Sequence, residues 1–192
     1  MSYHSPRVVD PNTFQIGGGL SVSPWLNNLY GLGGEIFMKY GFSGGYDFGV
    51  HLNTHSFPAG IGLSAKKQFN PNINLIDAVN FELGGIYSFR IPILTIEDEI
   101  FAGINLLKDD FAIQIRVKKG KTILVPMLIG DGETHTYGID EISLGIFYEL
   151  KRNNNNLLFV INGAYRREID KDNQELLYPS IGGGISYYFN IK

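Results

Sequence analysis

The feature that most constrains the fold of this chain is an alternation of apolar and polar residues that recurs along nearly its whole length. From Tyr46 to Asn53, every second residue is Tyr, Phe, Val or Leu, and the residues between them are Asp, Gly, His and Asn. A period of two places successive side chains on opposite faces, which indicates strands rather than helices. We predict about ten strands, within a range of eight to twelve, at Thr13–Val22, Leu32–Tyr40, Tyr46–Asn53, Phe57–Lys66, Ala78–Phe89, Glu99–Leu107, Phe111–Lys118, Ile139–Leu150, Leu157–Glu168 and Ile181–Asn190.

The connections between these segments fall into two kinds. Tight polar turns are predicted at Gly41–Gly45, Gln68–Asn74, Lys108–Asp110 and Arg152–Asn156, and the other linkers are Ser23–Asn28, Asn53–Ser56, Ile91–Asp98, Lys119–Tyr137 and Ile169–Pro179. Such interleaving is typical of an up-and-down meander, in which an even strand number places both termini at the short-turn end. Within the longest linker, Lys119–Lys121 is a predicted hairpin tip, and Thr122–Ile129 is predicted to extend a strand rather than form a flap.

Composition indicates which side of the sheet faces which medium. A soluble barrel buries its apolar face, whereas a transmembrane barrel turns that face outward. Here the polar face is rich in Gly, which weakens a solvated strand, and only 18% of residues are charged, against the usual ~25%. Tyrosines near the predicted strand ends fit interfacial aromatic belts: Tyr30, Tyr40, Tyr46, Tyr87, Tyr148, Tyr165 and Tyr187. We therefore predict an all-β, transmembrane up-and-down antiparallel β-barrel, in preference to a soluble one.

Several classes of chemistry are excluded or disfavoured by composition. A net charge of −3 argues against a nucleic-acid partner. The absence of Cys excludes disulfides, zinc–thiolate sites and a thiol nucleophile. No metal-ligand spacing joins His4, His51, His55 and His135. We expect no cofactor and no metal.

The last predicted strand carries a short pattern of polar, Gly and aromatic positions. Ser180–Tyr187 fits it, and Gly184, Tyr187 and Phe189 fit it one dyad further on. The pattern resembles the C-terminal assembly signal of bacterial outer-membrane barrels, which assigns that role to Gly182, Gly184, Tyr187 and Phe189. Phe14–Leu20, Gly41–Leu52 and Phe57–Phe69 extend the resemblance to small Gly-rich outer-membrane barrels of hypothetical or lipoprotein type.

That resemblance implies a cellular location and a set of partners. It implies the outer membrane of a Gram-negative envelope, with outer-membrane lipid and the barrel-assembly machinery as partners and a lipidated Cys upstream in related proteins. No signal peptide stands at Met1, and the first residues look like a trimmed mature chain with a new initiator. We expect residues 1–12 to be an N-terminal periplasmic linker and residues 13–192 to be the barrel domain.

Charges of both signs fall on the face predicted to line the lumen. They are Glu35, Lys39, Asp47, His51, Glu82, Arg116, Glu141, Glu149 and Arg166. Inside a narrow barrel such charges must pair or be hydrated, because an isolated buried charge costs several kcal/mol. They form either a selectivity lining or small polar solute site, or a salt-bridged plug that fills the lumen, which we favour. His51, Asp47 and Glu82 are candidates for an acid–base set, although a hydrogen-bonding role for His51 is favoured.

Three functional hypotheses follow. The favoured one is a non-enzymatic, porin-like outer-membrane barrel that acts as a narrow pore, a small-solute channel, or a structural or interaction subunit with a protein partner at its loops. The second is an outer-membrane barrel enzyme of the lipid hydrolase or protease type. The third is a soluble lipocalin-like barrel that binds an apolar ligand.

Overall fold

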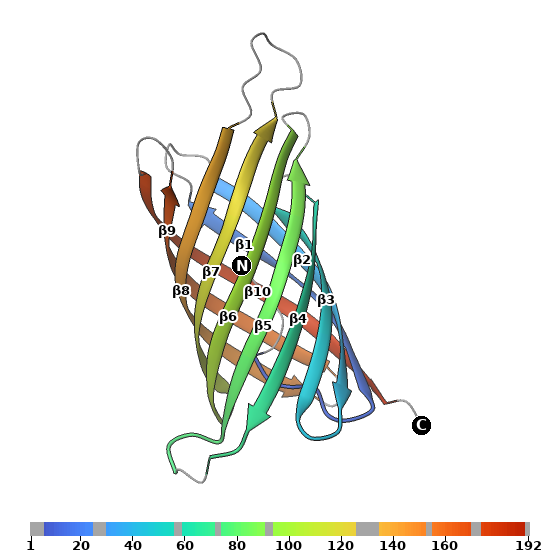
Figure 1. Cartoon of the computed structure of the whole chain (residues 1–192). Helices are drawn as coiled ribbons and strands as arrows, with labels where there is room; N and C mark the ends of the chain where they lie inside the picture. Colours follow the sequence, from blue (N-terminus) through green and yellow to red (C-terminus); the bar gives the residue numbers. More distant parts are fainter. Residues whose placement is uncertain are drawn as a thin grey trace.

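A computed structural model describes residues 6–24, 30–55, 59–71, 74–90, 94–125, 135–152, 155–169 and 174–190. In these residues ten antiparallel strands form one closed barrel (Figure 1). The strands are β1 (Thr13–Pro24), β2 (Tyr30–Phe42), β3 (Tyr46–His55), β4 (Ala59–Phe69), β5 (Ala78–Arg90), β6 (Leu94–Lys108), β7 (Phe111–Val125), β8 (His135–Arg152), β9 (Asn155–Ile169) and β10 (Gln174–Asn190). The predicted fold class and the predicted number of strands are confirmed.

Each strand pairs with the next along the chain, and β10 closes the barrel against β1. Thr13 lies opposite Asn190, so the first and last strands have their outer ends at the same end of the barrel, which is the short-turn end, as predicted. Gly184 permits close approach at this seam, because a Cβ there would lie only 2.8 Å from the Gly18 carbonyl oxygen.

The predicted boundaries fail mainly at the end opposite the short turns, which we call the long-loop end. The predicted hairpin tip at Lys119–Lys121 is wrong, because β7 runs through it and Gly120 pairs with Glu99 on one side and Ile139 on the other. A Cβ on Gly120 would lie 2.4 Å from the Asp98 carbonyl oxygen, so this glycine serves strand packing rather than a turn.

Other linkers are also shorter than predicted. β6 begins at Leu94 and β10 at Gln174, inside linkers predicted to end at Asp98 and Pro179. Thr122–Val125 extends β7 as predicted, and residues 126–129 lie outside the described residues. At the short-turn end, the predicted tight turn at Gln68–Asn74 belongs instead to a longer connection between Phe69 and Ala78. Pairing across the sheet therefore overrides local turn signals at the starts of β6 and β10.

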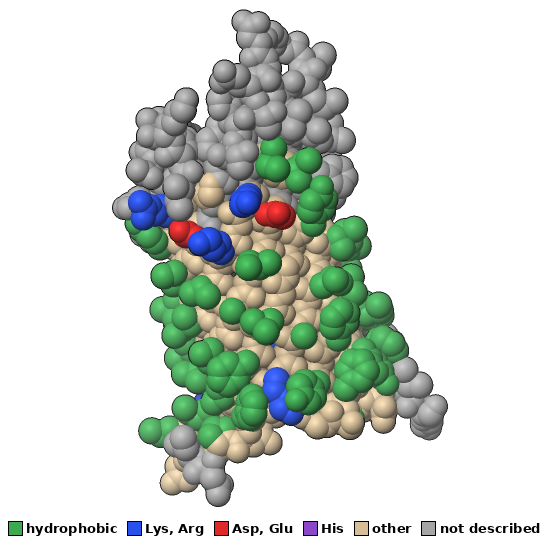
Figure 2. All heavy atoms as spheres, viewed as in Figure 1, with side chains coloured by type: hydrophobic (Ala, Val, Ile, Leu, Met, Phe, Trp, Pro, Cys, Tyr) green, Lys and Arg blue, Asp and Glu red, His purple; other side chains and the backbone are tan. Residues whose placement is uncertain are grey.

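The outer surface of the barrel is apolar between its two ends. Along β8, Ile142, Leu144, Ile146 and Leu150 are 41–58% exposed, and Figure 2 shows such side chains spread over the barrel wall. On other strands, Phe48, Ile113 and Ile185 of the predicted apolar face are likewise 45–49% exposed, and Val50 is half-buried. From Ile142 to Leu150 the strand advances roughly 26 Å at ~3.3 Å per residue. A typical tilt of ~40° converts this to roughly 20 Å of height, close to the ~25 Å apolar band of membrane barrels.

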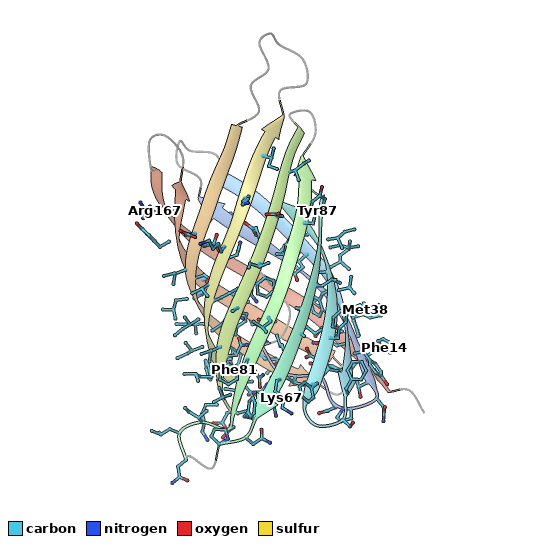
Figure 3. The ribbon with its side chains drawn as sticks, in the orientation of Figure 1. Phe14, Met38, Lys67, Phe81, Tyr87 and Arg167 are labelled. Atoms are coloured by element: carbon cyan, nitrogen blue, oxygen red, sulfur yellow. The ribbon has the colours of Figure 1, made fainter. Side chains whose placement is uncertain are left out.

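An aromatic belt surrounds the short-turn end. Ring pairs join neighbouring strands there, with centroids 4.8 Å apart for Phe14 and Tyr40, 5.6 Å for Phe69 and Phe81, and 4.9 Å for Phe111 and Tyr148. Phe14 and Phe81 lie at this end in Figure 3. Among the predicted belt tyrosines, Tyr46 and Tyr187 at this end, and Tyr87 and Tyr165 toward the long-loop end, are 43–54% exposed. Tyr40 and Tyr148 are half-buried. The side chain of Tyr30 lies outside the described set.

The interior is mostly polar, but its described residues include an apolar cluster that the alternating pattern of the sequence does not predict. Its members are Ala78, Leu107, Ala112, Phe147, Leu158 and Val160. They point inward from β5 to β9, on the face predicted to be polar. Among the described residues, no helix is long and apolar enough to cross a membrane.

Candidate functional site: the barrel lumen

Alternating charges follow one ring of the barrel wall. In register across neighbouring strands stand Asp47 on β3, Lys66 on β4 and Glu82 on β5, and Gly103 and Arg116 follow on β6 and β7. The four charged side chains belong to the polar face of the sheet, which lines the lumen. These four residues are at most 6% exposed.

Glu82 is the centre of this ring. Arg116 Nη2 lies 2.8 Å from Glu82 Oε2, and Lys66 Nζ lies 3.8 Å from the other carboxylate oxygen. Gln114 Nε2 donates to Glu82 Oε2 at 3.3 Å and to Asn105 Oδ1 at 2.8 Å. The Arg116 guanidinium also lies 4.5 Å from the Phe101 ring centroid. These contacts offset the desolvation of the buried charges, as a stable lumenal network requires.

A second cluster joins β2, β3 and β4. His51 Nδ1 lies 2.9 Å from Glu35 Oε1, and His51 Nε2 lies 2.6 Å from Ser64 Oγ. All three residues are at most 3% exposed. A serine, a histidine and a carboxylate joined in this order have the connectivity of a nucleophile, a base and an orienting acid. Gly49 stands beside them, and a Cβ there would lie 3.0 Å from Ser64 Oγ and 3.2 Å from His51 Nε2.

The predicted acid–base set of His51, Asp47 and Glu82 is not assembled through any hydrogen bond that the structure records among them. His51 instead contacts Glu35 and Ser64, while Glu82 contacts Arg116 and Lys66. Lys39 is buried, with Nζ 5.9 Å from the centroid of the Phe37 ring.

The segment from Pro6 to Asn12 folds into the short-turn mouth of the barrel. The Val9 N–H donates to Asp47 Oδ2 at 3.1 Å, and Val9 is 2% exposed. Asn80 Nδ2 donates to the Pro6 carbonyl at 2.6 Å, and Arg7 Nε lies 3.0 Å from Glu149 Oε2. The described part of the predicted linker therefore occupies the barrel entrance.

Gly41 at the end of β2 makes room for this segment. A Cβ on Gly41 would lie 2.1 Å from the Asp10 carbonyl oxygen, and the Asn12 N–H donates to the Gly41 carbonyl at 2.9 Å. We call residues 6–12 the mouth segment. Beside it lies an open cavity of about 650 Å³ whose walls include Arg7, Asp10, Gln68, Asp77 and Lys108.

Nearer the long-loop end, Lys118 Nζ lies 3.1 Å from Glu99 Oε2 and 3.3 Å from Glu141 Oε1. Lys118 and Glu141 also border an interior cavity, together with Arg116, Ser143 and Phe147. The volume of this cavity is about 20 Å³, which is room for about one water molecule. Side chains thus occupy most of the interior at this level.

Most of the predicted lumen residues lie inside the barrel. Glu35, Lys39, Asp47, His51, Glu82, Arg116 and Glu149 are buried, and Glu141 is partly buried. The side chain of Arg166 lies outside the described set. Of the predicted assembly residues, Gly182, Gly184 and Tyr187 stand on β10 with Tyr187 facing outward, and the side chain of Phe189 is outside the described set. Their assembly role stays a prediction.

Lys66, Ser64 and Gln15 stand on the polar face that the alternation predicts to line the lumen, and all three are buried there. One contributor, Arg7, was missed by sequence reasoning about the lumen. Arg7 lies before the first strand, where no periodicity identifies a contact with Glu149. Among the described residues, no group of three or more His, Asp or Glu could hold a metal ion.

The apolar wall and the charged interior define the class of the fold: an inside-out, closed antiparallel β-barrel of ten strands. No protein-family model and no curated protein sequence matches the chain.

Solved structures do resemble it. The N-terminal β-barrel domain of Pseudomonas aeruginosa OprF is 11% identical with a TM-score of 0.42, and the match covers 93% of this chain and 98% of that one. The KdgM porin is 11% identical with a TM-score of 0.46, covering 92% and 99%. Neisserial surface protein A is 13% identical with a TM-score of 0.40, covering 92% and 96%.

Proposed function

We propose that the protein is a bacterial outer-membrane β-barrel whose lumen is occluded, and that it serves as a structural or interaction subunit rather than an open pore. Closed barrels with an apolar exterior belong to outer-membrane-type bilayers, since a closed sheet satisfies every backbone group without water. The soluble lipocalin-like alternative does not fit, because residues such as Phe48, Ile113 and Ile185 face outward rather than into a dry centre.

The observation that carries occlusion is the Lys66–Glu82–Arg116 ion group. It projects from β4, β5 and β7 into the lumen with side chains at most 7% exposed. A conducting pore keeps its lining charges hydrated, whereas these side chains contact one another. The mouth segment narrows the short-turn end as well.

Planar-bilayer conductance tests this proposal. We expect the inserted wild-type protein to show no steady open level. The variant Glu82→Ala/Arg116→Ala removes two ring side chains and should give measurable conductance, whereas the long-loop-end variant Lys118→Gln/Glu141→Gln should stay closed. A steady open level in the wild type would favour the narrow-pore alternative instead.

Membrane spanning is tested separately by the depth dependence of a lysine on the outer wall. Ile146→Lys lies near the middle of the apolar stretch of β8 and should cost ~2–4 kcal/mol, whereas Leu150→Lys near its edge should cost ~0–1 kcal/mol. Equal costs at both positions, measured by unfolding in lipid vesicles, would contradict a membrane-spanning wall.

A second candidate function is favoured by one observation, the Ser64–His51–Glu35 connectivity. In a barrel hydrolase, Ser64 Oγ would attack an ester carbonyl while His51 takes its proton. A small fluorophosphonate probe tests this directly. Labelling of the wild type that disappears in Ser64→Ala but persists in Ser186→Ala would support the hydrolase. The absence of labelling is expected for the occluded barrel, because Ser64 is 2% exposed.

A further inference from the structure

Outward-facing charges interrupt the apolar wall at one place near the long-loop end. They are Asp98, Lys119, Lys121, Asp140 and Arg167, which we call the border patch. Figure 2 shows charged side chains gathered there above the apolar wall, and Figure 3 places Arg167 at that end.

The patch begins where the apolar surface ends. On β7, Val117 is the last 50%-exposed apolar residue before Lys119 on the same face, and on β9, Tyr165 stands one dyad before Arg167. β8 runs antiparallel to β7, and on it Asp140 lies one dyad beyond Ile142 toward the long-loop end. If the apolar wall spans the bilayer, these charges lie at headgroup level, so the inference rests on the proposed function.

Three cations lie close together in this patch. Lys119 and Arg167 both stand opposite Asp140, from the strands on either side of it. Neighbouring strands are ~4.8 Å apart, so the two cations originate roughly 10 Å from each other. Lys121 points outward one dyad beyond Lys119 on β7.

Three acids stand in register with these cations, with Asp140 opposite both Lys119 and Arg167, Glu175 on β10 opposite Arg167, and Asp98 opposite Lys121. Asp98 lies opposite Lys121 on one side, but on the other side Lys121 stands opposite Gly138, which has no side chain. An anion can therefore approach Lys121 from the side of β8, where Gly138 leaves space. Lys and Arg are the side chains that bind phosphate oxygens most strongly, Arg through a bidentate fork.

The other described walls at this height lack such a group. Val22 on β1 and Tyr87 on β5 are exposed outward-facing residues there, and both are uncharged. The short-turn end carries the aromatic belt instead, with Lys67 held 3.7 Å from the Tyr46 ring centroid. Among the residues whose side chains are described, the cations that face outward at the long-loop end are thus Lys119, Lys121 and Arg167, all on β7 and β9.

We propose that the border patch binds a lipid with a phosphorylated headgroup, through Lys119, Lys121 and Arg167, in the leaflet at the long-loop end. The acyl chains of that lipid would lie along the apolar wall formed by residues such as Val117 and Ile142 directly beside the patch.

The experiment compares lipids retained by the protein in native mass spectrometry after extraction from vesicles of dioleoyl phosphatidic acid and dioleoyl phosphatidylcholine. We expect the wild type to retain phosphatidic acid in preference. Lys119→Gln/Lys121→Gln/Arg167→Gln should reduce that retention about tenfold, because each Lys or Arg beside an anionic headgroup contributes to the binding of that lipid. The matched control Lys67→Gln/Lys108→Gln, at the other end, should retain it fully.

Unchanged retention in the triple variant would overturn the proposal. Displacement of the lipid by millimolar inorganic phosphate would also overturn it, because the patch would then recognise the free ion. Flotation of the protein with vesicles is measured in parallel. Failure of the wild type to float would contradict the membrane-spanning function itself, whereas flotation of both proteins with equal lipid retention would contradict only the lipid site.

Discussion

Arg116 reaches across β6 to Glu82, with Nη2 and Oε2 2.8 Å apart. In register between them stands Gly103, which has no side chain to block the path. A glycine placed between two buried opposite charges lets strands that are not neighbours form an ion pair.

Gly103 should therefore be sensitive to side-chain size. A Cβ there would lie 3.3 Å from the Ile115 carbonyl oxygen and 3.6 Å from Arg116 Cβ, so Gly103→Ala should change the free energy of unfolding by about 1 kcal/mol or less. Gly103→Leu should displace Arg116 from Glu82 and cost more. Heat-dependent gel migration in detergent measures both. Equal stability of the two variants would show that the path is not restricted.

Removing the charge of Glu82 should be strongly destabilising. Glu82→Gln leaves Lys66 and Arg116 buried with less compensation, which typically costs ~3–5 kcal/mol. Glu141→Gln is the control, since Lys118 keeps its contact with Glu99 Oε2 when the charge of Glu141 is removed, so the loss should be smaller. Urea unfolding in lipid vesicles compares them, and similar losses in both would argue against a central role for Glu82.

The mouth segment can be tested with an introduced thiol, because the chain has no Cys. Val9→Cys should react slowly with a maleimide, since Val9 is 2% exposed. Adding Arg7→Gln removes the contact with Glu149, and a loss of about 1 kcal/mol should speed labelling roughly fivefold. Leu75→Cys, at a position 80% exposed, should react rapidly in both backgrounds. Equal rates at residues 9 and 75 would contradict a seated segment.

Acid should weaken one contact of the short-turn end. The hydrogen bond from Lys108, followed by that from the Asp109 N–H, holds the pKa of Asp77 below its usual value of 3.8. Because the folded-state pKa is lowered, the stabilisation is present above about pH 4 and is lost as pH falls through that lower pKa. Asp77→Asn should therefore lower Tm slightly at pH 7, and this difference should shrink as the pH falls below about 4. A difference that grows as the pH falls would contradict this assignment.

The strands could be predicted because one face of each carries apolar residues at every second position, as from Tyr46 to Leu52. Their ends at the long-loop end could not, because Gly120 and Pro179 are turn residues by local chemistry, yet both lie in paired strands. The lumenal charges were predictable by parity, but their partners were not. The contact between Arg7 and Glu149 joins residues 142 apart, and only the closed barrel brings them together.

Closure through Thr13 and Asn190 also constrains the order of biogenesis. Strand β1 is the earliest strand to be synthesised, and its second edge has no native neighbour until β10 exists. During translation and transport the polypeptide therefore carries unpaired backbone donors and acceptors at both margins of any partial sheet, a condition that invites aggregation. A chaperone or template that shields the free edge of β1 until β10 pairs with it would suppress this aggregation.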